Sequence, residues 1–172
     1  MEIEIVQALL IKVAVFAPIV VGIVQAVNGG ANVINLSLGG GGDSTVLRDL
    51  VKSVTERGIP IFAAAGNEPV ATPFFPAAYP EVTAVTARGE QVSPSGQVSI
   101  ANYANYGSFV DVAAPDASII YFADRPWYVR GTSAAAAYTS GMAAGLAETT
   151  RKSWADIQNI LQRNFPVPSG PK

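Results

Sequence analysis

Short runs of apolar residues alternate, in the first part of the chain, with segments whose apolar residues recur at helical spacing. The runs at 9–16, 32–40 and 59–67 are rich in β-branched residues, as in strands buried on both faces of a sheet. The segments 18–28 and 44–58 lie between them and carry one apolar helical face each. Strand, helix, strand, helix, strand with short connections predicts right-handed crossovers and a parallel sheet. Ligands bind such sheets beyond the carboxyl ends of the strands, here "SLGG" and "AAAGN".

The expected helix bounds rest on residues that start or stop helices. Pro18 suits a first helical turn, and "NGG" suits the end of that helix. Ser44 is an expected N-cap for the second helix, and Gly58 an expected stop.

The middle of the chain is less regular. Four prolines in 68–82 predict a loop. Short strands are expected afterwards at 82–87, 109–114 and 118–122, and the segment 88–97 is expected to be a turn-rich excursion.

Two helices are expected near the end of the chain. The alanine-rich segment 132–150 contains Gly141 and Gly145, which predicts a helix that packs closely on its neighbours. The segment 153–164 predicts an amphipathic helix capped by Ser153, with Ile157, Ile160 and Leu161 facing inward.

Composition narrows the class of protein. Apolar residues make up 49% of the 172 residues and charged residues only 14%, so much of the chain is expected to be buried. Together with the pattern, this predicts a three-layer α/β fold, with helices on both faces of a mainly parallel sheet. The net charge of −2 provides no basic field for nucleic acid or for an anionic membrane.

The apolar segment 5–27 resembles a signal peptide or a membrane span only in its composition. Glu2 and Glu4 precede it where a signal peptide has positive charge, and Lys12 and Pro18 interrupt it. A buried strand followed by a buried helix is therefore expected, and no compartment is assigned.

The chain contains neither cysteine nor histidine. Disulfides and thiolate catalysis are therefore excluded. A transition-metal site would need carboxylates alone, and no tight carboxylate cluster is apparent, so no metal or other cofactor is expected.

The sequence "GTSAAAAYTSGMAAG" at 131–145 presents Ser133 after a glycine and a threonine, at the expected start of a helix. Enzymes present nucleophilic serines in this way, and the positive end of a helix favours developing negative charge. Ser133 could also act only as a helix cap. The usual base of a serine nucleophile, histidine, is missing from the chain.

Five stretches together carry a family resemblance: "GANVINLSLGG", "IPIFAAAGNE", "PAAYPEVTAVTA", "YGSFVDVAAPD" and "RGTSAA" with "SGMAAG". Their order and spacing resemble the later two-thirds of the catalytic domain of subtilisin-like serine peptidases. The resemblance implies the subtilisin-like α/β fold, with residues 1–172 as one truncated or reduced domain.

The resemblance also implies site residues. Ser133 matches the nucleophile, and Asn67 matches the asparagine whose side-chain amide stabilises the oxyanion. Ser37, Leu38 and Gly39 match the family's strand that pairs with the substrate backbone. Ala64, Ala65 and Gly66 match the wall of the family's primary specificity pocket.

Several departures from the family pattern bear on activity. The segment that carries the family's histidine has no counterpart here. The catalytic aspartate is missing in both registers considered for "IKVAVFA": one places Ala17 at that position, and the other makes "IKVAVF" the strand directly before the helix at 19–28. Ala137 and Tyr138 stand where the family usually has proline and histidine.

Two other groups could replace histidine as the base. The related sedolisins use a glutamate four residues before an aspartate, but no Glu-x-x-x-Asp occurs in this chain. A Ser–Lys arrangement would require Lys12, which is expected at the start of a strand and far from Ser133.

Two functional hypotheses remain. One is an inactive relative, a pseudoprotease or peptide-binding domain; Met1 directly before a foldable strand favours such a self-contained product. The other is a serine peptidase completed by an N-terminal segment or a partner chain; apolar surface left where the missing helix would pack favours this hypothesis or a homo-oligomer. The expected partners are accordingly a peptide or protein ligand, a complementing fragment or a second copy.

Other residues receive structural roles. Asp111 and Asp116 are expected to anchor loops, and Glu68 to be a solvated loop acid. Trp127 and Tyr128 are expected to be wall or core aromatics.

Overall fold

The computed structural model describes residues 16–92 and 98–168. It contains four helices and seven strands in this part of the chain. The helices are α1 (Phe16–Asn28), α2 (Thr45–Glu56), α3 (Thr132–Thr150) and α4 (Trp154–Asn164). The strands are β1 (Ile34–Leu36), β2 (Ile61–Ala64), β3 (Val82–Val92), β4 (Val98–Ile100), β5 (Val112–Ala114), β6 (Ala117–Phe122) and β7 (Arg125–Arg130).

The main sheet is mostly parallel, as predicted. β1 pairs with β2, β2 with β3, and β3 with β5, all in parallel. β4 adds an antiparallel strand to the far part of β3. The carboxyl ends of β1 and β2 consequently lie side by side, because Leu36 is in register with Ala63.

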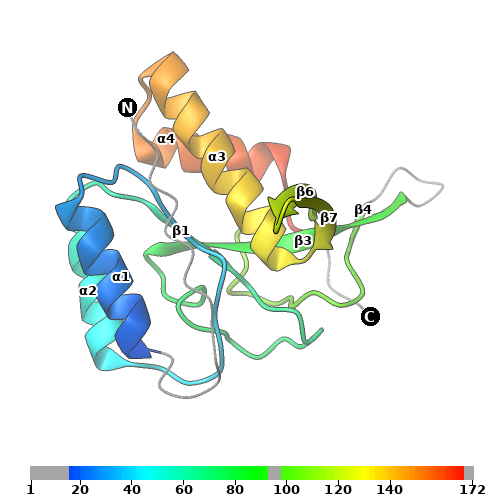
Figure 1. The fold of residues 1–172 in the computed structure, drawn as a ribbon, viewed down its shortest axis with the longest axis horizontal. Coiled ribbons are helices and arrows are strands. Elements are labelled where there is room, and N and C mark those ends of the chain that lie inside the picture. The colour runs from blue at the N-terminus through cyan, green and yellow to red at the C-terminus, as the bar shows by residue number, and fades with distance from the viewer. Residues whose placement is uncertain (1–15, 93–97, 169–172) are drawn as a thin grey trace.

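Helices cover both faces of this sheet (Figure 1). On one face α1 and α2 pack together, and Ile61 and Ala63 of β2 belong to their core cluster. On the other face α3 and α4 pack over Phe62 and Ala64, the alternate residues of the same strand. The α/β fold with a three-layer arrangement is therefore confirmed.

The predicted caps account for two of the helices. The Ser44 hydroxyl accepts a hydrogen bond from the Leu47 amide at 3.4 Å. The Ser153 hydroxyl accepts one from the Asp156 amide at 3.2 Å. Gly58 adopts a φ of +82° just after α2, where a side chain would be strained.

The prediction for 88–97 was wrong in part. Residues 88–92 continue β3, and Arg88 pairs with Ile100 of β4, although the pairing register shifts between Arg88 and Val92. Gly89, which suggested a turn, instead allows a close approach, because a Cβ there would lie 2.6 Å from Ser99 Oγ. Residues 93–97 lie outside the described residues.

Strand β7 was not predicted, because Pro126 and the two flanking arginines interrupt its pattern. The strand expected at 9–16 lies outside the described residues except for Phe16, which begins α1. Ala17 lies in the first turn of that helix, which favours the register in which the helix follows directly. None of the described helices is long and apolar enough to cross a bilayer.

Candidate active site

Ser133 lies in the first turn of α3, directly beyond a glycine with an unusual backbone. Gly131 has a φ of +151°, and its carbonyl accepts the amides of Ala134 and Ala135 at 3.0 and 3.2 Å. The chain therefore turns sharply into the helix at this point. The half-buried Ser133 side chain sits at the positive end of the helix dipole.

Ser133 and Ser37 contact each other through two hydrogen bonds. Ser133 Oγ donates to the Ser37 carbonyl at 3.1 Å, and Ser37 Oγ donates to the Ser133 carbonyl at 2.9 Å. Asn35 Nδ2 in turn donates to Ser37 Oγ at 2.9 Å. The end of β1 is thereby fixed against the start of α3.

Asn67 is joined to the same helix start through Thr132. Asn67 Oδ1 accepts hydrogen bonds from the Thr132 amide and from Thr132 Oγ1, both at 3.0 Å. Thr132 Oγ1 also accepts the Gly66 amide at 3.2 Å. Because Oδ1 is committed to Thr132, the Asn67 side chain presents its Nδ2 donor beside Gly131, where a Cβ would lie 3.4 Å from it.

Asn105 forms a second set of hydrogen bonds, which fixes the turn at Asn67. The backbone N–H of the buried Asn105 donates to the Gly66 carbonyl at 2.9 Å, and Asn105 Oδ1 accepts the Glu68 amide at 2.8 Å. Gly66 has a φ of +113°, and a Cβ there would clash with the Asn105 amide and lie 2.9 Å from the Phe74 ring. Only glycine fits at position 66.

The expected substrate-contacting residues border this turn. Leu38, Ala64 and Ala65 are buried, whereas Ser37, Gly39 and Gly66 are half-buried. A Cβ on Gly39 would lie 3.2 Å from the Phe75 carbonyl. The next residue, Gly40, exchanges two backbone hydrogen bonds with Phe75 at 3.0 and 2.9 Å. Their roles toward a substrate stay predictions.

Asp116 anchors the chain just before Gly131. Its backbone carbonyl accepts the Gly131 amide at 3.1 Å. Its buried carboxylate accepts Arg130 Nε at 3.1 Å and Nη2 at 2.9 Å, and also accepts a short hydrogen bond from the Tyr103 hydroxyl. Burial, followed by the bond to this carboxylate, raises the pKa of Tyr103 far above its usual value.

Asp111 also holds a loop, as predicted. Its Oδ2 accepts the Ala84 amide at 2.8 Å. Burial raises the pKa of the Asp111 carboxyl, and the bond from Ala84 lowers it by less. Both aspartates therefore act as anchors in the fold.

A cavity of about 450 Å³ opens beside Ser133, between α3 and the strands β6 and β7. Arg130 and Tyr138 are the ionisable side chains among its described lining residues. Tyr138 also meets the Phe165 ring edge-to-face at 5.8 Å. No group of three carboxylates that could hold a metal occurs among residues 16–92 and 98–168.

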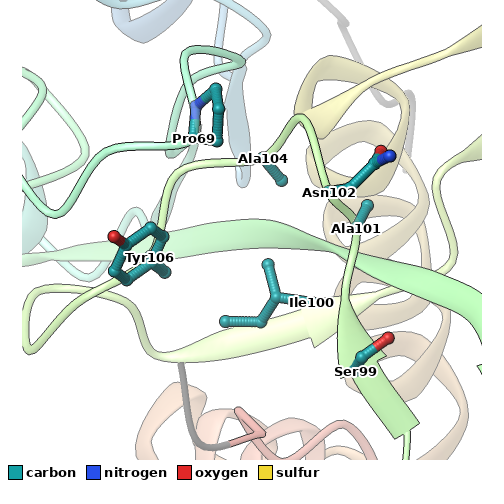
Figure 2. Close-up of a pocket in the computed structure, with 7 residues that line it drawn as sticks. All are labelled: Pro69, Ser99, Ile100, Ala101, Asn102, Ala104 and Tyr106. Carbon is teal, nitrogen blue, oxygen red and sulfur yellow. The ribbon is translucent and has the colours of Figure 1, made fainter. Parts of the chain in front are cut away.

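A second cavity of about 310 Å³ lies away from Ser133. It is lined by residues of the 99–106 segment and Pro69, and Ile100 points into it (Figure 2). None of the eight predicted site residues lines it. We therefore place the candidate site at the first cavity.

The expectation that Trp127 and Tyr128 are wall or core aromatics was wrong, because neither is buried and neither lines the cavity beside Ser133. Both lie on β7 and are 46% and 64% exposed. The hairpin that carries them stands apart from the main sheet, so its aromatic side chains have no core to enter.

The sequence patterns did not predict a role in the site for the residues that orient it. Thr132 was visible in the "GTS" sequence, and Asn35 was visible as a polar residue inside an apolar run. Asn105, Tyr103 and Arg130 gave no signal, because their partners lie far away in the sequence.

Comparison with known proteins gives consistent results. The model of the subtilase family matches residues 16–168. A thermophilic serine proteinase of Bacillus sp. (strain AK1) is 38% identical over 150 residues, which is 86% of this chain and 36% of that protein. Thermitase of Thermoactinomyces vulgaris is 35% identical over 151 residues, or 87% of this chain and 52% of that protein.

Solved structures agree with the sequence comparisons. The prenylagaramide maturation protease PagA superposes with a TM-score of 0.73 at 27% identity, covering 84% of this chain and 55% of that one. A cold-adapted subtilisin-like serine proteinase gives a TM-score of 0.72 at 26% identity, covering 84% and 53%. The chain thus spans from about a third to about half of these relatives.

Proposed function

Because this chain belongs to the subtilase family, we propose that it is the nucleophile-bearing part of a subtilisin-like serine peptidase domain, with Ser133 as the nucleophile and Asn67 as an oxyanion donor. One observation carries the assignment: Thr132 binds Asn67 Oδ1 twice and is covalently joined to Ser133. The donor and the nucleophile are therefore held together before any substrate arrives.

These residues suit acyl transfer. Attack of Ser133 Oγ on a peptide carbonyl forms a tetrahedral intermediate whose oxygen carries negative charge. Asn67 Nδ2 and the Ser133 amide would stabilise that charge, and the start of α3 adds a favourable dipole. Residues Ser37–Gly39 and Ala64–Gly66 would receive the peptide.

The chain alone is proposed to be inactive, as a pseudoprotease or peptide-binding relative. It contains no histidine, and Ser133 Oγ donates a hydrogen bond to the Ser37 carbonyl, which cannot act as a general base. In subtilisin, a member of the same family, removing the nucleophile or the histidine lowers kcat about 10⁶-fold. A chain that has the serine and the asparagine but no base should therefore have a similarly low kcat.

The alternative is an active peptidase completed by an N-terminal segment or a partner chain. It is supported by the hydrogen bonds that fix Ser133 and by the cavity of about 450 Å³ beside it, which leaves space for a further group. The greater length of the relatives agrees with such a completion.

Labelling with a fluorophosphonate probe tests both versions. The chain alone should stay unlabelled, and Ser133→Ala is the control for any signal. Mixing with a polypeptide that carries the family's aspartate and histidine segments should restore labelling if the site is completed in this way. Binding of an unreactive peptide, without labelling of the chain alone or in the mixture, supports the pseudoprotease. Rapid labelling of the chain alone contradicts inactivity, and absence of both labelling and peptide binding contradicts the assignment.

A further inference from the structure

The strands β6 and β7 form a two-stranded sheet of their own, separate from the main sheet. They pair in antiparallel register from Ala117↔Arg130 to Phe122↔Arg125 and lie beside α3 (Figure 1). At the base of the hairpin, Arg130 also contacts Asp116 and the Tyr103 ring. The turn between them consists of Ala123 and Asp124, with φ values of +50° and +57°. Glycine or asparagine normally occupies such positions, so Ala123 adds strain to a hairpin that has little support.

This hairpin exposes more large apolar side chains than any other described element. Tyr121 is 80% exposed, Phe122 71%, Ile119 66% and Tyr128 64%. Ile120 and Trp127 add 45% and 46%. Aromatic side chains carry about 150–250 Å² each, so these six leave on the order of 800 Å² uncovered, close to one partner's share of a standard protein interface.

The two edges of the hairpin differ in how well they are protected. Strand β7 carries Arg125, Pro126 and Arg130, the residue types that prevent further strand pairing. Strand β6 reads "ASIIYF", with neither charge nor proline, and pairs only with β7 among the described residues. Its other edge therefore presents unpaired backbone groups together with residues of high β-propensity.

We propose that a second copy of this chain docks on this hairpin by antiparallel pairing of β6 with β6 about a two-fold axis. Such a contact is self-complementary, because the same patch is buried on both copies, and it closes after two chains. It joins the two hairpins into one four-stranded sheet, and sheets of three or more strands with an apolar face are stable where a two-stranded hairpin is marginal. Four of the six exposed apolar side chains, Ile119, Ile120, Tyr121 and Phe122, lie on the strand that forms this contact. The proposal does not depend on the peptidase assignment.

The oligomeric state tests the proposal directly. Analytical ultracentrifugation of the full chain at micromolar concentration should give a dimer. The double variant Ile119→Lys with Tyr121→Lys should give a monomer, because paired lysines would face each other across the axis. Val46→Lys is the matched control: Val46 is 67% exposed on α2, against 66% for Ile119, and this variant should remain dimeric. Far-UV circular dichroism checks that each variant is folded.

Cysteine cross-linking tests the pairing without adding charge, since the chain has no cysteine of its own. Ile119→Cys should oxidise readily to a disulfide-linked dimer. Tyr128→Cys lies opposite Ile119 on β7 and should not, because three strand spacings, about 14 Å, would separate the two copies of that residue, well beyond disulfide reach.

A wild-type chain that is monomeric at these concentrations overturns the proposal. So does a dimer that survives the double lysine variant, or equal cross-linking of the two cysteine variants.

Discussion

The hydroxyl groups of Ser37 and Ser133 each donate a hydrogen bond to the backbone carbonyl of the other residue. This exchange joins the end of β1 to the start of α3 and holds Ser133 in one position. It also means that Ser37 acts on the site through its side chain as well as its backbone.

Ser37→Ala should therefore loosen the site. The substitution removes the bond to the Ser133 carbonyl and leaves Asn35 Nδ2 without its acceptor, so we expect a loss of about 1–3 kcal/mol in the free energy of unfolding. Urea denaturation measures it. Ser53→Ala, at an exposed position of α2, is the control and should change stability by less than about 0.5 kcal/mol. Equal effects of the two variants would contradict the role of Ser37.

Thr132→Val should weaken the attachment of Asn67 to the start of α3. The side chain is fully buried, and its hydroxyl donates to Asn67 Oδ1 and accepts the Gly66 amide. Valine keeps the shape but leaves the Gly66 amide unpaired and Asn67 Oδ1 with only the backbone amide of residue 132, which should cost about 1–3 kcal/mol in urea denaturation. Thr139→Val, equally buried but bonded only to the Ala135 carbonyl within α3, should cost less. A larger loss at Thr139 would argue against the coupling.

Gly66→Ala should be the most damaging of these changes. The backbone there has a φ of +113°, and the new methyl group would clash with Asn105 and approach the Phe74 ring. We expect destabilisation of about 3 kcal/mol or more. Gly141→Ala tests the opposite case, since nothing lies within 4 Å of a Cβ at this exposed position of α3. That variant should gain about 0.5–1 kcal/mol in thermal or urea unfolding.

Asp116→Asn should weaken the base of the β6–β7 hairpin. The carboxylate accepts from Arg130 twice and from Tyr103, and an amide replaces its charge with a donor that these partners cannot use. Removing a buried charged partner should cost about 2–4 kcal/mol. Urea unfolding followed by tryptophan fluorescence reports it, because Trp127 lies on this hairpin. The exposed Glu148→Gln is the control, and equal stability of the two variants would refute the anchor.

Asp111→Asn should alter how stability depends on pH. Burial raises the pKa of Asp111 in the folded state above its value in the unfolded chain. The Asp111 carboxyl therefore favours the folded wild-type chain when it is protonated. This contribution to stability is fully present below the unfolded pKa and is lost as pH rises through the folded pKa. Asparagine can still accept the Ala84 amide without a buried charge, so the variant should be more stable than wild type at pH 7, and the difference should vanish near pH 4. Melting temperatures across this range, with exposed Asp49→Asn as the control, measure it. A gain that is constant with pH would contradict the burial effect.

Local sequence signals predicted most of the fold. Ser44, Gly58 and Ser153 marked helix ends correctly, since capping depends on neighbours in the chain. The apolar runs at 32–40 and 59–67 gave two parallel strands, because strands buried on both faces need continuous apolar sequence. The strand in which Pro126 lies was missed, since an edge strand tolerates residues that a central strand does not.

The candidate site was predictable only in part. Ser133 and Asn67 were identified through the family resemblance, and the structure brings both to Thr132. Asn105 supports the Asn67 turn through bonds to residues 66 and 68, and no pattern in a single sequence links positions so far apart. Polar anchors of this kind are determined by tertiary contacts, which periodicity and propensity do not encode.

The bonds around Ser133 join segments that are 96 and 65 residues apart in the chain. Contacts with such large sequence separation form slowly, after the loops between them have closed. The geometry at Ser133 should therefore be among the last parts of the domain to form during refolding, so any reactivity of this serine would report that the sheet and α3 have already come together.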